Sequence, residues 1–522
     1  MKPRTVRFFL AATPTGWEGA SIVTAALLTT AAYPPFHLFL PSFVCLAPVV
    51  LHLLAPSSPG HAIQRAAVVG FWFGLLTHGF VASWLVPALS HQTSFALLLY
   101  GVIIGTLAAG TAGVFALTRW IHHRTGFTVV ILFPLMWTAY EWLLAHLGPL
   151  SYPWLWLGTS LTGYPAFIQT AEFVGARGLT FLLALANATL AVAWTQRRDR
   201  TRALKLVGIT SVAIAFVGVF GVVRARSIPL RSVGRITLVQ PNVGVEEKWD
   251  PANARRMLND LLALSDDAVR SDRPDIIVWP ETALPVFLAN EPGWNRRIAR
   301  HVQAAGAVLV TGAMDLGDGP NDSRAIYNAA FVFDRSGHRD RTTRYYKRRL
   351  APLVERNPFP FPARRDNELT PGSQGKLFSP GTPPFGVLIC HEGAFEELSR
   401  AYRRDGADFL INISNDSWFA GTNGPHQHAA HVVMRAVENR IGIARAGNGG
   451  ISQLVDATGR RHNVLDVGAH AQSTGILWTS DTTTLYTRLG DWVGVASILS
   501  MFGLIGFAHY AKARARAVAL KT

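Results

Sequence analysis

The sequence predicts two kinds of structure in one chain, a polytopic α-helical membrane domain of about eight transmembrane helices and a globular α/β domain. Three observations indicate this combination. Mean hydropathy is +0.22 and only 16% of the 522 residues are charged, which is typical of membrane proteins. Apolar stretches recur in the first half of the chain and near its end. Residues 231–487 instead have ordinary globular composition, with alternating strand-like and helix-like stretches.

The apolar stretches define the predicted membrane domain. Most are close to the roughly 20 residues that a helix needs to cross the hydrocarbon core of a bilayer. They lie at residues 17–33, 39–54, 66–85, 95–118, 127–147, 173–194, 206–223 and 492–510. We therefore expect residues 1–226 to form a domain of seven transmembrane helices, 231–487 to form the globular domain, and 490–522 to form one more transmembrane helix with a basic tail.

Basic residues in the loops predict the orientation of these helices. Net charge is +16, and Lys and Arg concentrate in alternate loops such as residues 119–124 and 196–205, while residues 91–93 and 148–156 contain neither. Because positive residues favour cytoplasmic loops, both termini are expected in the cytoplasm and the globular domain outside it. The same distribution indicates lipid-surface charge and argues against nucleic-acid binding, since no aromatic-interleaved basic platform is present.

Two acids, Glu141 and Glu172, lie in or beside predicted membrane helices. A carboxylate is costly to place in a bilayer and is often functional there. Hydrogen bonding between helices would account for these residues equally well.

The globular segment follows an α/β pattern. Strands are expected at residues 235–240, 275–278, 308–311, 328–333, 387–390 and 409–413, and helices at 251–270, 293–305, 394–405 and 427–440. Residues 352–372 are rich in Pro and Arg without a clear period, which predicts a long loop. The chain has two cysteines, Cys45 and Cys390, so the globular segment cannot contain an internal disulfide.

Cys390 follows five residues, Phe385-Gly386-Val387-Leu388-Ile389, that are typical of a buried strand. A thiol at the end of such a strand lies beside main-chain N–H groups that the turn leaves free, and these groups can stabilise an oxyanion. An inert buried thiol fits the local sequence equally well.

Two further residues occupy comparable positions. Glu281 ends the strand-like stretch Ile276-Ile277-Val278-Trp279-Pro280, and Lys347 follows Tyr345-Tyr346. Taken singly, the first is explained as a surface or capping acid and the second as one of many surface lysines. In the order Glu, Lys, Cys they resemble the catalytic triad of the nitrilase superfamily.

The resemblance extends over nearly the whole chain. With seven predicted helices before the globular domain and one after it, the sequence is similar to the apolipoprotein N-acyltransferase family of bacterial inner membranes. The motifs that carry this resemblance are Val239-Gln240-Pro241-Asn242 with Trp249, Trp279-Pro280-Glu281, Tyr345-x-Lys347 with Leu350, Pro352 and Glu355, Ile389-Cys390-His391-Glu392, Asn415-Asp416-Ser417-Trp418-Phe419 and Arg435-Ala436-Val437-Glu438-Asn439-Arg440.

The resemblance implies that residues 231–487 form a nitrilase-like α-β-β-α sandwich that is catalytic. Cys390 would be the nucleophile and Glu281 the general base, since a thiol with a pKa near ~8.5 is mostly protonated at neutral pH. Lys347 and the N–H after Cys390 would hold the oxyanion. Supporting roles fall to Glu355, His391 and Glu392. The aromatic residues that would contact lipid, or simply pack in the core, are Trp249, Trp418 and Phe419.

The implied reaction has two steps. A phospholipid donates an acyl chain to Cys390 as a thioester, and the N-terminal amine of a diacylglyceryl-cysteine apolipoprotein accepts it. The chemistry requires no cofactor and no metal, in agreement with a sequence that has no phosphate-binding or metal-ligand motif.

The sequence departs from the family pattern at two places. His391 replaces the usual tyrosine, and Leu353-Val354 replaces Phe-Gly. These changes concern substrate preference more than reaction type. Two other functions stay open: a membrane-anchored amidohydrolase of nitrilase type, which passes the thioester to water, and a non-catalytic membrane protein with a degenerate nitrilase domain.

Overall fold

The computed structural model describes residues 13–56, 58–154, 156–319, 324–340, 343–357 and 368–519. The basic start of the chain (residues 1–7) and residues 358–367 of the expected long loop lie outside the described residues. The chain divides into two compact units, one with residues 1–86, 95–223 and 491–522 and the other with residues 87–94 and 224–490.

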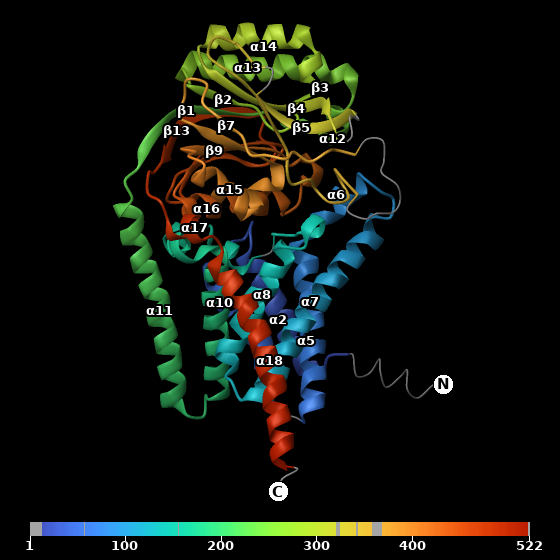
Figure 1. The fold of residues 1–522 in the computed structure, drawn as a ribbon, viewed down its shortest axis with the longest axis vertical. Coiled ribbons are helices and arrows are strands. Elements are labelled where there is room, and N and C mark those ends of the chain that lie inside the picture. The colour runs from blue at the N-terminus through green and yellow to red at the C-terminus, as the bar shows by residue number, and fades with distance from the viewer. Residues whose placement is uncertain are drawn as a thin grey trace. The chain divides into compact units, whose positions relative to one another are not determined.

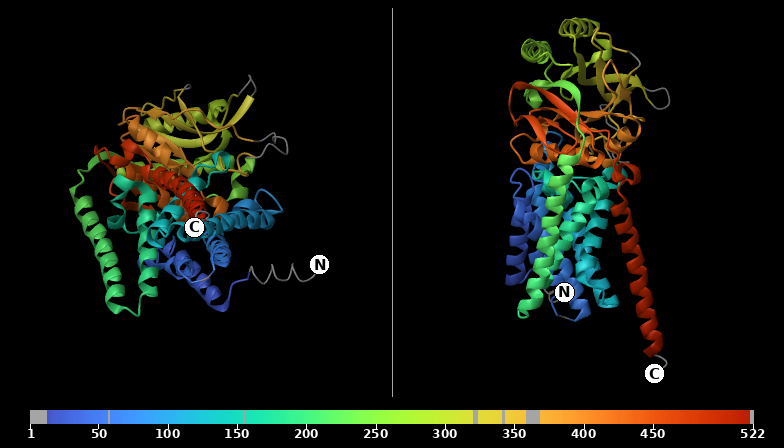
Figure 2. Two further views of the ribbon diagram at one scale, coloured as in Figure 1. Left: turned by 60° about the horizontal axis from the view of Figure 1, so that its bottom comes forward. Right: turned by 90° about the vertical axis from the view of Figure 1, so that its left-hand side faces the viewer.

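The first unit is helical (Figure 1). Its helices are α2 (Gly16–Ala32), α3 (Phe39–Val44), α4 (Ala47–Val50), α5 (Pro59–Val81), α7 (Ala96–Thr125), α8 (Val129–Ala145), α9 (Pro165–Ile168), α10 (Ala171–Thr195), α11 (Arg200–Ser227) and α18 (Trp492–Ala519). Most of the short helix α6 (Leu85–Ser90) belongs to the second unit. Helix α18 is far from the others in sequence, yet it packs against α7, α8 and α10 (Figures 1 and 2).

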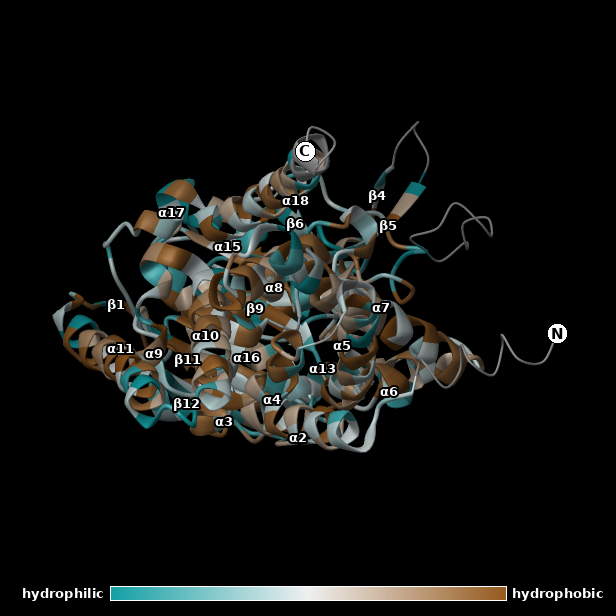
Figure 3. Cartoon of the chain, turned by 90° about the horizontal axis from the view of Figure 1, so that it is seen from below, coloured by the Kyte–Doolittle hydropathy of each residue, from teal (hydrophilic) through white to brown (hydrophobic). Residues whose placement is uncertain are grey.

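The predicted count of about eight transmembrane helices is not confirmed. Within the described residues, four helices are both long and apolar enough to cross a membrane, at Ala96–Thr125, Ala171–Thr195, Arg200–Ser227 and Trp492–Arg514. Figure 3 shows hydrophobic residues along α10 and α11. The stretch expected at residues 39–54 is broken into α3, α4 and a 3₁₀ turn. The reason is local, because Pro48 lacks the N–H group that a continuous helix would need to bond to Val44.

Glu141 on α8 is fully engaged in hydrogen bonds. Its carboxylate accepts from Trp137 Nε1 at 3.0 Å, Leu157 N at 2.9 Å and Thr180 Oγ1 at 2.8 Å. These donors come from α8, from the 3₁₀ turn at Leu157–Leu161 and from α10. Hydrogen bonding between elements therefore accounts for this buried acid.

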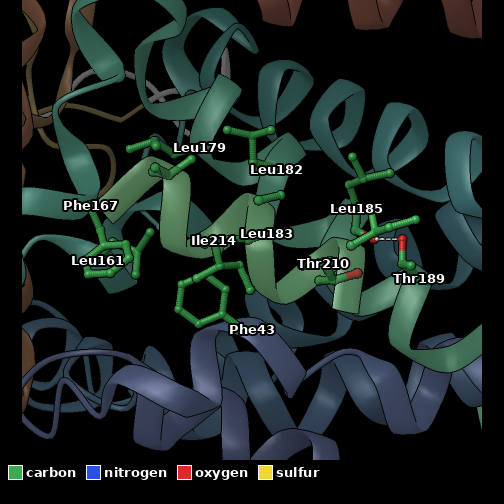
Figure 4. Close-up of a pocket in the computed structure, with 14 residues that line it drawn as sticks. Phe43, Leu161, Phe167, Leu179, Leu182, Leu183, Leu185, Thr189, Thr210 and Ile214 are labelled. Atoms are coloured by element: carbon green, nitrogen blue, oxygen red, sulfur yellow. Dashed lines mark hydrogen bonds between the residues drawn. The ribbon is translucent and has the colours of Figure 1, made fainter. Parts of the chain in front are cut away.

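A cavity of about 190 Å³ lies between α10 and α11 (Figure 4). Its walls are mostly aliphatic and aromatic, with Phe43, Phe167, Leu183 and Ile214 among them. The polar side chain of Thr189 donates its hydroxyl to Leu185 O at 2.8 Å, so its hydrogen bond stays within its own helix. The cavity thus offers a predominantly hydrocarbon surface.

The second unit contains two β-sheets. In the described residues the first has seven strands, β1 (Arg231–Gln240), β2 (Ile276–Val278), β3 (Leu284–Phe287), β4 (Val308–Asp318), β5 (Arg324–Phe333), β6 (Arg344–Tyr346) and β13 (Ala471–Thr479). The second has six, β7 (Leu377–Phe378), β8 (Phe385–Ile389), β9 (Phe409–Asn415), β10 (Gly442–Asn448), β11 (Ser452–Val455) and β12 (Arg461–Leu465).

Helices cover the outer faces of both sheets. They are α13 (Ala254–Asp272), α14 (Pro292–Ala305), α15 (Glu396–Arg404) and α16 (Gly424–Asn439). The unit also contains the short helices α12 (Val245–Lys248) and α17 (Leu485–Leu489), and α17 packs against α15 and α16. Figure 1 shows α13 and α14 beyond the first sheet and α15 and α16 beyond the second. The two sheets contact each other mainly through β1 and β13 of the first and β10, β11 and β12 of the second. The arrangement is the expected α-β-β-α sandwich.

Parallel pairing brings the predicted site residues to strand ends. Strand β2 pairs in parallel with β1 and β4, and β8 pairs in parallel with β9. Every residue of β2 and β8 is buried, which explains their uninterrupted apolar sequences. Glu281 follows β2 and Cys390 follows β8, so both residues lie beyond the carboxyl ends of buried parallel strands, where ligand sites in α/β sheets are commonly found.

Candidate active site

Lys347 lies between two carboxylates. Its Nζ donates to Glu281 Oε1 at 3.1 Å and to Glu355 Oε1 at 2.9 Å. The lysine side chain is 1% exposed. The main-chain N–H of Lys347 donates to Asn328 O on β5 at 2.9 Å, which continues the sheet past the end of β6. Two of the three predicted catalytic residues and the predicted supporting acid Glu355 therefore form one buried cluster.

Asn328 completes this cluster. Its Nδ2 donates to the same two oxygens as Lys347, at 2.7 Å to Glu281 and 3.0 Å to Glu355. The other Glu281 oxygen accepts Asn415 N at 2.8 Å. Sequence reasoning did not identify Asn328. The available signal was a polar residue directly before the apolar run Ala329–Phe333 of strand β5.

A glycine allows Glu281 to approach the sheet. A side chain at Gly312 on β4 would place its Cβ 2.7 Å from Glu281 Cα and 2.6 Å from Thr282 N. Those distances are shorter than van der Waals contact, so a larger residue would displace the turn that carries Glu281.

The charges of the cluster fix the protonation states of Glu281 and Lys347. Burial opposes ionisation of Glu281, but the Lys347 ammonium and the Asn328 amide hold the pKa of Glu281 below its usual value. Burial would likewise lower the pKa of Lys347, but the carboxylates of Glu281 and Glu355 raise this pKa well above its usual value. Both groups are ionised at neutral pH.

Cys390 is the first residue after β8 and is half-buried. Its φ of 57° lies in the left-handed region, which is unusual for a residue with a side chain and is often found at functional sites. Burial and the Glu281 carboxylate raise the pKa of the thiol, while the Lys347 ammonium lowers it. The resting thiol is therefore protonated, and its attack on an acyl group requires a base.

Glu392 connects the segments that carry Lys347 and Cys390. Its carboxylate accepts the N–H groups of Ile389 at 2.8 Å, Arg348 at 2.6 Å and Arg349 at 3.0 Å, and the Tyr345 hydroxyl at 2.9 Å. Ile389 belongs to β8 in the second sheet, whereas Tyr345 belongs to β6 in the first. Burial raises the pKa of Glu392, although the three main-chain donors oppose this change.

The remaining predicted residues have different environments. The ring of His391 lies edge-on to Phe395, with 5.5 Å between centroids, and burial holds the pKa of His391 well below its usual value. Trp249 is 44% exposed. Trp418 contacts His91, and Phe419 is buried with its ring 6.0 Å from that of His428. Among the predicted lipid contacts, Trp249 has the most accessible surface and Phe419 is part of the core.

Lys248, at the end of α12, is a buried lysine that sequence reasoning did not single out. Its Nζ donates to Glu281 O at 3.1 Å, and the residue is 1% exposed. Burial lowers the pKa of Lys248 to about 7, although the charge of the Glu281 carboxylate opposes this change. An unfolded chain would bind this proton up to about pH 10.5.

We predict that Lys248 makes the free energy of unfolding rise with pH. Between about pH 7 and about pH 10.5 the unfolded chain binds more protons than the folded protein, so stability increases with pH in that window. Lys248→Met should therefore be stabilising near pH 7, by at most about 5 kcal/mol, and should lose this advantage near pH 10. Thermal unfolding of parent and variant in detergent across this range measures the difference. Lys376→Met, at an exposed position, is the matched control, and a parent–variant difference that is constant with pH would contradict the prediction.

Two family models match the chain. Residues 25–189 match the apolipoprotein N-acyltransferase N-terminal domain, and residues 235–479 match carbon-nitrogen hydrolase. A solved amidase from Nesterenkonia sp. also aligns, at 21% identity and a TM-score of 0.35, over 50% of this chain and 95% of the amidase.

Two relatives, both named apolipoprotein N-acyltransferase, align with most of the chain. The one from Bradyrhizobium diazoefficiens is 31% identical over 511 residues, which cover 91% of this chain and 92% of the relative. The one from Geobacter metallireducens is 29% identical over 450 residues, or 83% of this chain and 85% of the relative. Identity at this level over both units, with a family model matching in each, places the chain in the apolipoprotein N-acyltransferase family.

Proposed function

We propose that this protein is an acyltransferase that moves an acyl chain from a phospholipid, through a thioester on Cys390, to the N-terminal amine of a diacylglyceryl-cysteine apolipoprotein. The observation that carries this proposal is the buried Glu281–Lys347–Glu355 cluster, whose charges act directly on the pKa of Cys390. Family membership supports a phospholipid donor and a lipoprotein acceptor, and the long apolar helices suit a protein whose acyl donor resides in a membrane.

In the first step, Cys390 Sγ attacks the carbonyl carbon of the phospholipid ester. Glu281 takes the thiol proton, which its ionised state allows. Lys347 and the N–H of His391 stabilise the oxyanion. The ester C–O bond then breaks, and the departing lysophospholipid oxygen takes the proton from Glu281. The products are the acyl thioester and a lysophospholipid.

In the second step, the neutral N-terminal amine of the apolipoprotein attacks the thioester carbon. The amine proton passes to Glu281 and then to the Cys390 sulfur as the C–S bond breaks. An amide forms and the resting thiol returns. Glu355 holds Lys347 in place throughout, because it accepts from the same ammonium. Neither step consumes a cofactor or a metal ion.

The proposed setting is the bacterial inner membrane. Residues 1–226 and 490–522 are assigned to the membrane part and residues 231–487 to the catalytic domain, with both termini in the cytoplasm and the catalytic domain outside it. The basic loops at residues 119–124 and 196–205 support this orientation. Trp249 is the best placed of the three aromatic residues to contact an acyl chain, because nearly half of its surface is accessible.

The test is the mass of the intact protein after incubation with phospholipid. We expect the parent to gain one acyl chain and Cys390→Ala to gain none. Cys45→Ala is the matched control, since Cys45 is the other cysteine and is buried in the first unit; this variant should be acylated normally. Addition of a diacylglyceryl-cysteine peptide should discharge the adduct and yield an N-acylated peptide.

The alternatives give other outcomes. Discharge by water at the same rate with and without the peptide would favour a membrane-anchored amidohydrolase of nitrilase type. Absence of an adduct with every phospholipid tested would favour a degenerate, non-catalytic domain.

A further inference from the structure

A second cluster of buried polar residues contacts the main chain of Cys390. None of the reaction steps above involves it. It comprises Asn412 and Asp416 at and after β9, His428 on α16 and Arg445 on β10. The exposure of each is 0% or 1%. Burial of this many polar and charged groups is expensive, and a buried ion pair is often no more stabilising than well-packed apolar side chains. The cluster therefore calls for an explanation other than stability.

Two members, His428 and Asn412, interact with the main chain of Cys390; Asn412 is the one that also joins it to strand β8. Its Nδ2 donates to Cys390 O at 3.1 Å and also to Leu388 O at 3.1 Å. Asn412 lies opposite Leu388 in the parallel pairing of β9 with β8. The Asn412 side chain thus bonds both to strand β8, which leads to the nucleophile, and to the carbonyl of the nucleophile itself.

Arg445 determines which way the Asn412 amide points. A guanidinium group can only donate hydrogen bonds, and Arg445 Nη1 donates to Asn412 Oδ1. The amide nitrogen must therefore face the carbonyl of Cys390. Arg445 is itself held by Asp416 Oδ2 at 2.7 Å and by Ile451 O at 3.2 Å.

Asp416 is fixed in turn by two further donors. His428 Nδ1 lies 2.9 Å from Asp416 Oδ1, and the Ser414 hydroxyl donates to the same oxygen at 2.6 Å. The Arg445 charge holds the pKa of Asp416 well below its usual value even though burial opposes ionisation. Asp416 is therefore a permanent anion that keeps Arg445, and through it Asn412, in one orientation.

Peptide geometry makes this contact relevant to catalysis. The carbonyl of Cys390 and the N–H of His391 belong to the same planar peptide group, and in a trans peptide they point in opposite directions. A hydrogen bond that fixes the carbonyl therefore also fixes the direction of the N–H. The left-handed φ of Cys390 is an intrinsically costly conformation, so the peptide needs such an external restraint.

We propose that Asn412, oriented by Arg445 and Asp416, is a positioning residue that aims the His391 N–H at the oxyanion. The inference rests on the proposed function, in which this N–H and Lys347 hold the oxyanion together. Asn412 itself touches no reacting atom. Its effect is transmitted through the peptide group that it holds.

Asn412→Asp is the discriminating variant. The aspartate keeps an acceptor for Arg445 and nearly the same shape, but it presents an oxygen to the carbonyl of Cys390 where the asparagine presented a donor. We expect acylation of Cys390 to fall by about 100-fold, the usual effect of losing one oxyanion donor. Asn439→Asp is the matched control, because Asn439 is equally buried and its Nδ2 also donates to a main-chain carbonyl, that of Arg435.

Two reactions of the same thiol separate positioning from general damage. Acylation by p-nitrophenyl butyrate passes through an oxyanion, whereas alkylation by iodoacetamide does not. The Asn412→Asp variant should lose acylation and keep its alkylation rate within about threefold of the parent, and Asn439→Asp should retain both. A parallel loss of both reactions, or unchanged acylation, would overturn the proposal.

A second variant guards against misfolding of the first. Arg445→Lys keeps the charge beside Asp416 but cannot donate to both Asp416 and Asn412 with the fixed geometry of a guanidinium. We expect it to lower acylation by about tenfold, less than Asn412→Asp but again with little effect on alkylation; equal loss of both reactions in this variant would also overturn the proposal.

The activated ester acylates any competent nucleophile, so a parent that reacts with it but not with phospholipid would refute the proposed donor and leave the role of Asn412 testable.

Discussion

Lys347→Met is expected to lower the rate of Cys390 acylation by about 1,000-fold or more. The variant loses an oxyanion donor, which alone costs about 10²–10³ in rate. It also loses the cation that keeps Glu281 ionised and the pKa of the thiol from rising further. The burst of p-nitrophenol from an activated ester measures the effect, and a burst rate within tenfold of the parent would rule out the proposed role of Lys347.

The same substitution should destabilise the fold. Lys347 Nζ bridges Glu281 and Glu355, and its removal leaves two carboxylates facing each other around the Asn328 amide. Leaving a buried charge without its partner typically costs about 3–5 kcal/mol. Lys347→Met combined with Glu355→Gln removes one of the two carboxylates, so this double variant should regain much of the stability while staying inactive.

The destabilisation should depend on pH. In the parent, the pKa of Glu281 is lowered in the folded state, so its stabilising effect is present above the pKa of the unfolded chain and is lost on acidification. Without Lys347, burial dominates and raises the pKa of Glu281, so the variant should lose stability as pH rises. The difference in unfolding midpoint between parent and variant should widen from about pH 5 to about pH 8. A difference that narrows would show that Lys347 does not set the charge of Glu281.

The strands that end on the reactive residues could be predicted from sequence because they are buried on both faces. Phe385–Ile389 and Ile276–Val278 are short apolar runs that end in a turn, and each continues into a residue with a reactive side chain. Neither run alternates apolar with polar residues, which indicates that both faces of the strand are covered and that the strand lies in the middle of a sheet. The order Glu, Lys, Cys along the chain then identified Glu281, Lys347 and Cys390 as a catalytic set. No one of the three residues indicated this by itself.

The strand β10 could not be predicted, because its burial depends on distant partners. Its sequence, Gly-Ile-Ala-Arg-Ala-Gly-Asn, contains small and polar residues that are typical of a loop. Arg445 is tolerated there because Asn412 on strand β9 and Asp416 just after it accept its hydrogen bonds. Asn328 and Lys248 escaped notice for the same reason, since a buried polar residue is recognisable only when its partners are known.

Glu392→Gln is expected to reduce both stability and activity. The carboxylate of Glu392 faces donors on both sides, with Ile389 N at one oxygen and Arg348 N and Arg349 N at the other. A glutamine must place its NH₂ group against one of these main-chain N–H groups whichever way the amide is turned. Hydrogen bonds to a buried charge contribute about 1.5–3 kcal/mol each, so we expect the free energy of unfolding to fall by about 3–5 kcal/mol.

The loss of activity should follow from the position of Glu392 between the two sheets. It holds the end of β8, which carries Cys390, against the end of β6, which carries Lys347. When this connection is broken, the nucleophile and the oxyanion donor are no longer fixed relative to each other, and errors of about 1 Å can cost about 100-fold in rate. Glu397→Gln is the control, because Glu397 forms an ion pair with Arg349 in which both side chains are 44% exposed, and loss of such a pair changes stability by less than about 1 kcal/mol. Thermal unfolding and the acylation burst should both separate the two variants, and equal effects of Glu392→Gln and Glu397→Gln would mean that the sheets are held in register by other contacts.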